Sequence, residues 1–208
     1  MNIVFIGVQG SGKGTQAKII AEKLGIVHIS TGDLLRSAQG NLKKEVDNYV
    51  NVGRLIPDDL MLKILNERLQ KSDAQKGFIL DGFPRNIEQA KALDKIIKIS
   101  NAFDIHISDE EALKRLSGRV TCEKCKAGYN LYTAPKPKNP AICDICQGKL
   151  IQRADDNPEA IKKRIEIYHK DTEPIIKFYN TIKVNGEQSI EKVTQDIEKA
   201  IKMINMFK

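Results

Sequence analysis

Short runs of consecutive hydrophobic residues alternate along this chain with longer stretches in which hydrophobic residues recur every three or four positions. The short runs predict buried β-strands at residues 3–6, 26–29, 78–80, 103–107 and 181–184. The longer stretches predict amphipathic helices at residues 16–24, 58–70, 87–99, 110–116 and 158–179, the last of them kinked or split by Pro174. Alternating strands and helices are typical of βαβ units, so we expect an α/β fold with a parallel sheet.

A glycine-rich segment, GVQGSGKGTQ at residues 7–16, directly follows the first predicted strand. It fits the phosphate-loop pattern G-x-x-x-x-G-K-[ST] at Gly7, Gly12 and Lys13, but Gly14 occupies the Ser/Thr position and Thr15 follows one residue later. Glycines let backbone N–H groups approach anionic oxygens, the next helix adds its positive end, and Lys13 adds a full charge. We interpret the segment as a nucleotide-polyphosphate site rather than a structural turn, because strand, loop, lysine and helix follow in the required order.

Two segments interrupt the strand–helix alternation. Residues 30 to about 56 have a helical pattern where a strand is due, and residues 119 to about 155 contain all four cysteines. We interpret both as insertions over the nucleotide site.

Length, charge and composition narrow the class of protein. The chain has 208 residues, 41% of them hydrophobic, which suits one α/β core with insertions. Its net charge of +7 comes from 34 basic and 27 acidic residues that are interleaved, and aromatic residues make up only 5%, so a nucleic-acid surface is not favoured. The N-terminal hydrophobic run is too short for a membrane span or a signal peptide. We therefore expect a cytoplasmic, monomeric enzyme without nucleic-acid or membrane partners.

The cysteines form two C-x-x-C pairs, Cys122 with Cys125 and Cys143 with Cys146, at a spacing typical of a zinc ribbon. Four thiolates complete a closed tetrahedral structural site, and a metal offsets the small hydrophobic content of this insertion, mainly Leu131, Ile142, Leu150 and Ile151. Disulfides and a nucleic-acid-binding ribbon are the alternatives. The first is disfavoured in a reducing compartment, and the second is expected to carry more exposed aromatic residues.

The segment FILDGFPRN places Asp81 at the end of a buried run and Arg85 shortly after it. In phosphate-loop enzymes a carboxylate at this position commonly serves magnesium, and guanidinium groups bind phosphate bidentately. Further candidate phosphate ligands lie near the edges of the insertions: Arg36, Arg115, Arg119, Arg153 and Arg164.

Six segments together resemble the adenylate kinase family in its long form with a zinc-binding lid. They are GVQGSGKGTQ, STGDLLR, GRLIPDDL, GFILDGFPRNIEQA, LSGRVTCEKC and RADDNPEAIKKRIEIYH, and the resemblance extends over essentially the whole chain. It implies a phosphate-loop NTPase-type, parallel five-stranded core flanked by helices, formed by residues 1–29, 60–118 and 156–208. The resemblance implies two inserted mobile domains as well, an AMP-binding domain at 30–59 and a zinc-binding lid at 119–155. It also implies reversible, Mg²⁺-dependent phosphoryl transfer, ATP + AMP = 2 ADP.

The resemblance also implies a site, residue by residue. The residues matched to ATP binding are Gly10, Ser11, Gly12, Lys13, Gly14, Thr15, Arg119, Gly128, Tyr129 and, in an uncertain loop register, Gln188. Those matched to AMP binding are Thr31, Arg36, Arg54, Leu55, Ile56, Gly82, Phe83, Pro84, Arg85, Gln89, Arg153 and Arg164. Asp33 and Asp81 are matched to acids that hold hydrated magnesium. Gln9 departs from the family, which usually has proline there.

Phosphoryl transfer to AMP needs positioned cations rather than a general base, because the acceptor phosphate is already anionic. We expect catalysis from Lys13, Arg85, Arg119, Arg153 and Arg164, and structural roles for the three histidines His28, His106 and His169. The carboxamide of Gln89 suits the N6 and N7 edge of adenine, where it donates one hydrogen bond and accepts another. A kinase for another nucleotide and a zinc-ribbon nucleic-acid-binding protein remain as alternatives.

Overall fold

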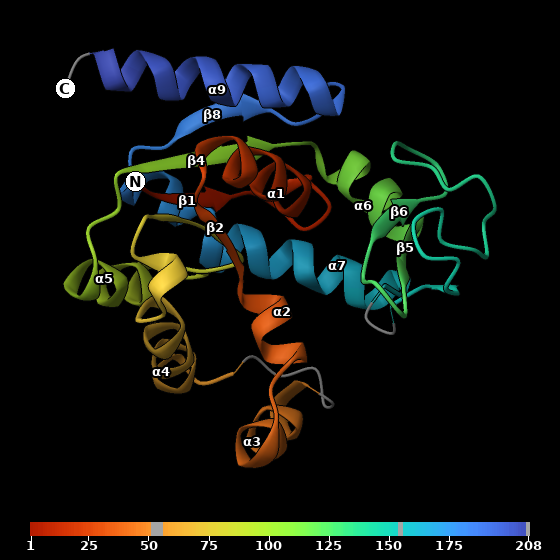
Figure 1. Cartoon of the computed structure of the whole chain (residues 1–208), viewed down its shortest axis with the longest axis horizontal. Coiled ribbons are helices and arrows are strands. Elements are labelled where there is room, and N and C mark those ends of the chain that lie inside the picture. The colour runs from red at the N-terminus through yellow and green to blue at the C-terminus, as the bar shows by residue number, and fades with distance from the viewer. Residues whose placement is uncertain (51–55, 154–155, 207–208) are drawn as a thin grey trace.

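A five-stranded parallel sheet forms the centre of the protein in this computed structural model, which describes residues 1–50, 56–153 and 156–206 (Figure 1). The strands are β1 (Asn2–Ile6), β2 (Val27–Ser30), β3 (Phe78–Asp81), β4 (Asn101–His106) and β8 (Ile182–Asn185), in the order β2-β3-β1-β4-β8. All five predicted strands are confirmed, with bounds that differ by no more than two residues. The predicted α/β fold with a parallel sheet is therefore correct.

Side chains alternate between the two faces of the sheet, as the period of a strand requires. In β1, Ile3 and Phe5 pack against α1 (Lys13–Leu24) and α9 (Ile190–Met206), which cover one face. Val4 and Ile6 pack toward the other face, which is covered by α4 (Asp58–Leu69), α5 (Ile87–Ile96), α6 (Asp109–Ser117), α7 (Pro158–Ile167) and α8 (Pro174–Phe178). Both faces are thus buried, which explains why the strands are continuous hydrophobic runs in the sequence.

The predicted helix at 158–179 is split, as Pro174 suggested. Between α7 and α8 lies a π-helical segment, η2 (Tyr168–Thr172), in which the N–H of Glu173 donates to the carbonyl of Tyr168 at 2.8 Å. Pro174, which has no N–H, then begins α8. The proline thus sits where a helix can begin without losing a hydrogen bond.

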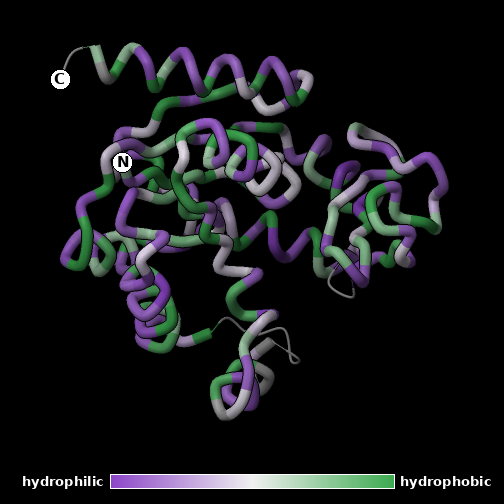
Figure 2. The backbone as a smooth tube through the Cα atoms, viewed as in Figure 1, coloured by the Kyte–Doolittle hydropathy of each residue, from purple (hydrophilic) through white to green (hydrophobic). Residues whose placement is uncertain are grey.

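The helix α9 is absent from our sequence prediction, although its signal is present. Val193, Ile197 and Ile201 recur at a spacing of four and are all buried against the sheet. Figure 2 shows hydrophobic and hydrophilic positions alternating along this helix. A short 3₁₀ helix, η1 (Ser72–Ala74), is the other element outside the insertions that we did not predict.

The two interrupting segments leave the core on different sides (Figure 1). The first forms α2 (Thr31–Arg36) and α3 (Gly40–Val50), which confirms its helical pattern. The second forms a separate antiparallel sheet of β5 (Arg119–Cys122), β6 (Gly128–Asn130) and β7 (Leu150–Ile151), in the order β6-β5-β7. The exact domain boundaries and the mobility of both insertions stay predictions. Within the described ranges, no helix has the length and apolar character needed to cross a membrane.

Replacing Ile197 by alanine tests the importance of α9 to the core. Ile197 is fully buried, so Ile197→Ala is expected to lower the free energy of unfolding by about 2–5 kcal/mol through lost burial and a residual cavity. Met203→Ala, on an exposed side chain of the same helix, is the control and is expected to change it by less than about 0.5 kcal/mol. Urea unfolding measures both. Equal effects of the two substitutions would contradict this packing of α9.

Candidate active site

The glycine-rich loop connects β1 to α1 at the carboxyl edge of the central strand, where ligands bind in open α/β sheets. Gly7, Gly10 and Gly12 have positive φ angles of 146°, 89° and 93°, which residues other than glycine rarely adopt. A Cβ on Gly7 would also overlap the carbonyl oxygen of Ile105. Gly12 precedes α1 without a side-chain cap, so it leaves the N-terminal N–H groups of the helix for a bound anion.

Lys13 is folded back over this loop. Its Nζ donates to the carbonyl oxygens of Gly7 at 2.6 Å and Val8 at 2.9 Å. Burial lowers the pKa of Lys13 from 10.5 to about 8; the nearby charges of Arg85 and Arg119 lower it further, and those of Asp81 and Asp104 oppose the shift. A phosphate that reaches Lys13 would replace two neutral acceptors with a charged one.

Asp81 lies close to Gly14 of the phosphate loop. A Cβ on Gly14 would lie 3.1 Å from Oδ2 of Asp81, which comes from the neighbouring strand β3. The second predicted magnesium acid, Asp33, begins the first insertion and accepts a 2.6 Å hydrogen bond from Arg36. Although burial raises the pKa of Asp33, the hydrogen bond and charge of Arg36 outweigh it, and the pKa lies below its ordinary value.

The fully buried carboxylate of Asp156 joins two of the predicted arginines. Arg119 donates to it through Nε at 2.8 Å and through a terminal nitrogen at 2.6 Å, and Arg164 donates to Oδ1 at 2.7 Å. Arg119 begins β5 and Arg164 belongs to α7, so Asp156 connects both ends of the second insertion. We did not single out Asp156 from the sequence; its signal was the acidic pair that follows Arg153.

The remaining arginines have different surroundings. Arg85 is held by a 2.8 Å hydrogen bond from Nε to the carbonyl of Gly82; burial lowers its pKa, as do the nearby charges of Arg36 and Arg164. Arg115 instead pairs with Glu111 at 2.7 Å along α6, which gives it a structural partner. Arg153 lies just beyond β7, and its carbonyl accepts the N–H of Asp156 at 3.0 Å.

Several of the residues matched to AMP binding lie at or just after the carboxyl ends of β2 and β3. Thr31 is buried, and its hydroxyl donates to the carbonyl of Asp81 at 3.3 Å. Directly after β3 come Gly82, Phe83, Pro84 and Arg85, with a cis bond before Pro84.

The other residues matched to AMP binding lie in different elements. Ile56 is half-buried against the hydrophobic core, whereas Arg54 and Leu55 lie outside the described residues. Gln89 is buried at the start of α5 and bonds to Asp58, a residue that the sequence analysis did not select.

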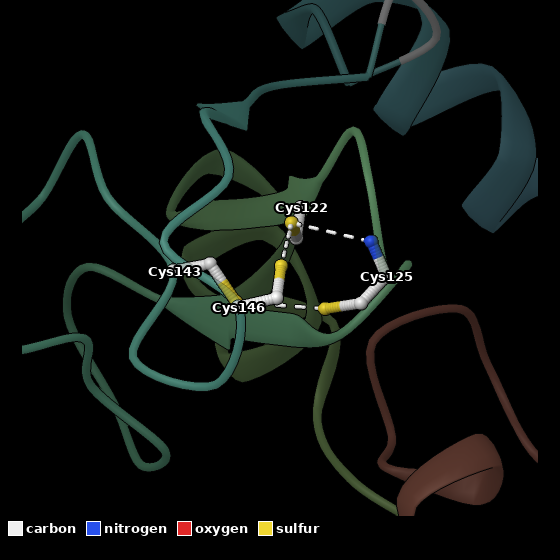
Figure 3. Close-up of side chains that lie close together, drawn as sticks. All are labelled: Cys122, Cys125, Cys143 and Cys146. Atoms are coloured by element: carbon white, nitrogen blue, oxygen red, sulfur yellow. Dashed lines mark hydrogen bonds between the residues drawn. The ribbon is translucent and has the colours of Figure 1, made fainter.

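The four cysteine sulfurs converge within the second insertion and lie within 4.8 Å of one another (Figure 3). The Sγ atoms of Cys122 and Cys146 are 3.4 Å apart, and those of Cys125 and Cys143 are 3.5 Å apart. A tetrahedral ion with Zn–S bonds of about 2.3 Å requires S···S separations of about 3.8 Å. The cluster therefore fits a structural metal ion.

Both C-x-x-C pairs fold in the same way. In each, the residue after the second cysteine has a positive φ, 61° for Lys126 and 58° for Gln147, and donates its N–H to the carbonyl of the first cysteine. A Cβ on Gly148 would approach Sγ of Cys122 to 2.9 Å, so a larger residue would crowd the cluster. This repeated turn directs two sulfurs from each pair to one point.

Hydrophobic packing in the second insertion differs from our expectation. Of the four residues expected to form its core, Leu150 is buried, whereas Leu131, Ile142 and Ile151 are exposed. The core consists of Val120, Cys122, Tyr129, Cys143 and Leu150. The cysteines thus supply much of the buried interior, which strengthens the argument that a metal ion stabilises it.

The surroundings of Tyr129 and Gln188 limit how they can contact ATP. The phenol of Tyr129 points into the lid core, where it accepts the N–H of Asp144 at 3.2 Å and lies 3.5 Å from Sγ of Cys143. Gln188 donates to the carbonyl of Asn185 at 3.0 Å and to Asp196 at 2.9 Å. Gly128 is exposed in β6. The assignment of these three residues to ATP stays a prediction.

Comparison with known proteins agrees with this geometry. Residues 5–202 match the family model described as adenylate kinase. The chain belongs to the adenylate kinase family. Its relatives include proteins named adenylate kinase from Thermodesulfovibrio yellowstonii (46% identical, covering 95% of this chain and 97% of the relative), Archaeoglobus fulgidus (44%, 98% and 99%) and Caldicellulosiruptor saccharolyticus (41%, 97% and 99%).

Membership in this family gives the activity. The protein is a nucleoside monophosphate kinase, a phosphotransferase that interconverts ATP + AMP and 2 ADP. The predicted function and enzyme class are therefore confirmed.

The buried lysine gives a pH dependence of stability without nucleotide. Because folding lowers the pKa of Lys13, the unfolded chain binds more protons between pH 8 and 10.5, so this residue's contribution to stability rises with pH across that window. Relative to Lys13→Met, the wild-type protein should gain unfolding free energy from pH 8 to 10.5, as measured by urea unfolding at each pH. Lys18→Met, on an exposed lysine of the same helix, controls for lost charge. A difference that is constant or falls with pH would contradict the assignment.

Proposed function

We propose that the phosphoryl group passes between ATP and AMP in the space bounded by the phosphate loop, the residues after β3 and the base of the second insertion. The observation that supports this most directly is the convergence of positive charge. Arg85 and Arg119 both act on the pKa of Lys13, while Arg36 and Arg164 act on that of Arg85. Such a concentration of cations suits two nucleotides whose phosphates meet end to end.

On the donor side, the loop residues Gly10, Ser11, Gly12, Lys13, Gly14 and Thr15 are proposed to surround the ATP phosphates. Lys13 would exchange the carbonyls of Gly7 and Val8 for phosphate oxygens. Arg119 and the backbone at Gly128 and Tyr129 would contact ATP from the lid, and Gln188 is proposed to lie near its base.

On the acceptor side, Arg36 and Arg85 are proposed to hold the AMP phosphate and Gln89 its base. The other proposed acceptor ligands are Thr31, Arg54, Leu55, Ile56, Gly82, Phe83, Pro84, Arg153 and Arg164. Arg153, Arg164, Arg119 and Lys13 would stabilise the charge that spreads over the transferring phosphoryl group. Positioning by these residues replaces general-base chemistry.

The histidines have partners that fit structural roles. Nε2 of His28 lies 3.6 Å from Asp81, and Nδ1 of His106 lies 3.8 Å from Asp104. His169 bridges Asp109 at 2.9 Å and Glu173 at 2.7 Å, and their hydrogen bonds raise its pKa. We propose structural rather than catalytic roles for all three histidines.

Asp33 and Asp81 are proposed to hold Mg²⁺ through water when Mg²⁺–ATP is bound. Magnesium neutralises phosphate charge and fixes the geometry of the polyphosphate. Both acids lie on the carboxyl side of the sheet, Asp81 at the end of β3 beside Gly14 and Asp33 just after β2.

Cys122, Cys125, Cys143 and Cys146 are proposed to hold a structural Zn²⁺. Four thiolates fill a tetrahedral site, so its contribution is to folding of the lid. The four cysteines form no disulfide, which also suits the reducing cytoplasm proposed for this enzyme.

Because one chain supplies both proposed nucleotide sites, we propose that it acts as a monomer without nucleic-acid or membrane partners. Closure of both insertions would exclude water from the transfer.

Two substitutions separate the donor and acceptor roles. Lys13→Met is expected to lower kcat at saturating nucleotides by roughly a hundredfold or more, because Lys13 serves the transferring phosphates. Arg85→Ala is expected to raise KM for AMP by about tenfold or more, with a smaller effect on KM for ATP. A coupled assay for ADP, with each nucleotide omitted in turn, measures both. Arg68→Ala is the control, since Arg68 pairs with Asp73 of η1 and is not among the proposed site residues. Equal changes in both KM values for Arg85→Ala would contradict the assignment of Arg85 to the acceptor.

Loss of the metal is expected to act through lid stability. Cys143→Ser should lower the thermal midpoint and increase proteolysis between residues 119 and 155. Turnover well below the midpoint should fall by less than about tenfold, because a closed site has no position for substrate. Ile145→Ser, in the same turn but 74% exposed, is the control and should retain metal. Metal content, midpoint and low-temperature turnover are measured on one preparation. A stable, protease-resistant variant with almost no turnover would show that the metal is catalytic.

A further inference from the structure

The carboxylate of Asp58, in the first turn of α4, contacts two side-chain amides at the start of α5. Its Oδ1 accepts a 2.6 Å hydrogen bond from Nε2 of Gln89, and its Oδ2 accepts a 3.2 Å bond from Nδ2 of Asn86. Asp58 is half-buried and Gln89 is buried, with 6% of its surface exposed. The short bond between them therefore lies in a site largely shielded from water.

The other side of the Gln89 amide is also fixed. Its Oε1 accepts the backbone N–H of Arg85 at 2.7 Å. Asn86 is fixed in the same way, because its Oδ1 accepts the N–H of Gln89 at 2.7 Å while its Nδ2 faces Asp58. Both amides are thus held between a backbone donor and the same carboxylate.

These partners determine the orientation of the Gln89 amide, that is, which side carries its nitrogen and which its oxygen. An ionised carboxylate only accepts hydrogen bonds, and a backbone N–H only donates them. Turning the amide by 180° would set two acceptors against each other at Asp58 and two donors against each other at Arg85. In a buried site, each mismatch leaves polar groups unsatisfied. The amide nitrogen therefore stays on the Asp58 side.

We propose that Asp58 is a specificity-determining positioning residue, which holds the Gln89 carboxamide in the orientation that accepts adenine and rejects a 6-oxopurine. The inference rests on the proposed role of Gln89 at the acceptor base. Both polar atoms of the Gln89 amide can form one more hydrogen bond, since Nε2 has a second hydrogen and Oε1 a second lone pair. These remaining positions are available to a base while Asp58 and Arg85 stay bound.

The orientation of the amide matters because adenine and 6-oxopurines present different hydrogen-bonding groups to it. Adenine presents an N6 amino donor beside a ring-nitrogen acceptor, so an amide oxygen facing N6 and an amide nitrogen facing the ring are both satisfied. A 6-oxopurine presents an acceptor, O6, in place of the amino group, and its N1 carries a hydrogen. On either edge the oxygen of a fixed amide then meets the acceptor O6, whereas an amide that turns can match the O6 and N1–H edge, though not the O6 and N7 edge. Fixing the amide therefore excludes guanine and hypoxanthine nucleotides.

The test compares AMP with inosine monophosphate, which has the same ribose phosphate and a 6-oxopurine base. Asp58→Asn keeps the shape of the side chain but offers the amide both a donor and an acceptor. It is expected to reduce the ratio of the two dissociation constants, inosine monophosphate over AMP, by about fivefold or more. Calorimetric titration of the full-length protein measures both constants, and kcat/KM with each acceptor gives the corresponding ratio in turnover.

Asp59→Asn is the matched control, because Asp59 shares the first helical turn and the charge but is exposed. It should leave the ratio unchanged. Ribose 5-phosphate, which has no base, should bind Asp58→Asn as it binds the wild type. If Asp58→Asn weakens ribose 5-phosphate and AMP equally and keeps the ratio, Asp58 is only structural and the proposal is overturned.

Gln89→Ala separates this inference from the proposed function. If Gln89→Ala leaves the ratio at its wild-type value, Gln89 does not recognise the base and its proposed role fails. If Gln89→Ala lowers the ratio while Asp58→Asn does not, recognition by Gln89 stands and positioning by Asp58 is overturned. A lower ratio in both variants, with Asp59→Asn unchanged, supports the inference.

Discussion

Positive charge is concentrated beside the phosphate loop, and the surrounding fold has to hold these cations in place. Lys13 and Arg85 are half-buried, the charge of Arg85 lowers the pKa of Lys13, and desolvation lowers the pKa of both. Buried cations are costly without partners, so each is held by groups of the protein itself. The carbonyls of Gly7 and Val8 hold Lys13, Gly82 holds Arg85, and Asp156 holds Arg119 and Arg164. Phosphates can take over these cations because several of the present acceptors are neutral carbonyls.

The parallel sheet makes this concentration possible. Loops from the carboxyl ends of parallel strands meet at one edge, so β1 supplies Lys13, β3 supplies Asp81 and Arg85, and the chain after β2 supplies Asp33 and Arg36. The second insertion brings Arg119 from β5 to a fully buried carboxylate that also binds Arg164 of α7. Asp156 therefore ties the base of the lid to the core while it balances two of the cations. A weak hydrophobic interior in the lid is tolerable because the cysteine cluster occupies its centre.

The sequence predicted the features that rest on local patterns. Strands buried on both faces are continuous hydrophobic runs, and the two C-x-x-C pairs determine their own turns, so both were found. Helix α9 was not predicted, although Val193, Ile197 and Ile201 have clear helical spacing. Asp58 and Asp156 could not be found from pattern alone. Each bonds to a residue that is distant in sequence, Gln89 in one case and Arg119 in the other, and an acidic residue near a helix start is ordinary in any sequence. Tyr129 was assigned to ATP by its position, whereas its phenol faces Cys143.

Lys13 and Gln89 both have hydrogen-bond partners within the protein before any nucleotide binds. The strength of these partners differs, and so does its consequence. At Lys13 the internal partners are neutral carbonyls, which the charged oxygens of the proposed phosphate ligand would outcompete, so binding would free the side chain to follow the phosphate. At Gln89 one partner is a carboxylate, which a neutral base cannot outcompete, so in the proposed role the amide would keep its partners and use its remaining hydrogen and lone pair. A group that must follow a moving phosphoryl group is therefore held weakly. A group that must distinguish two bases is held firmly, because an adaptable amide would accept both.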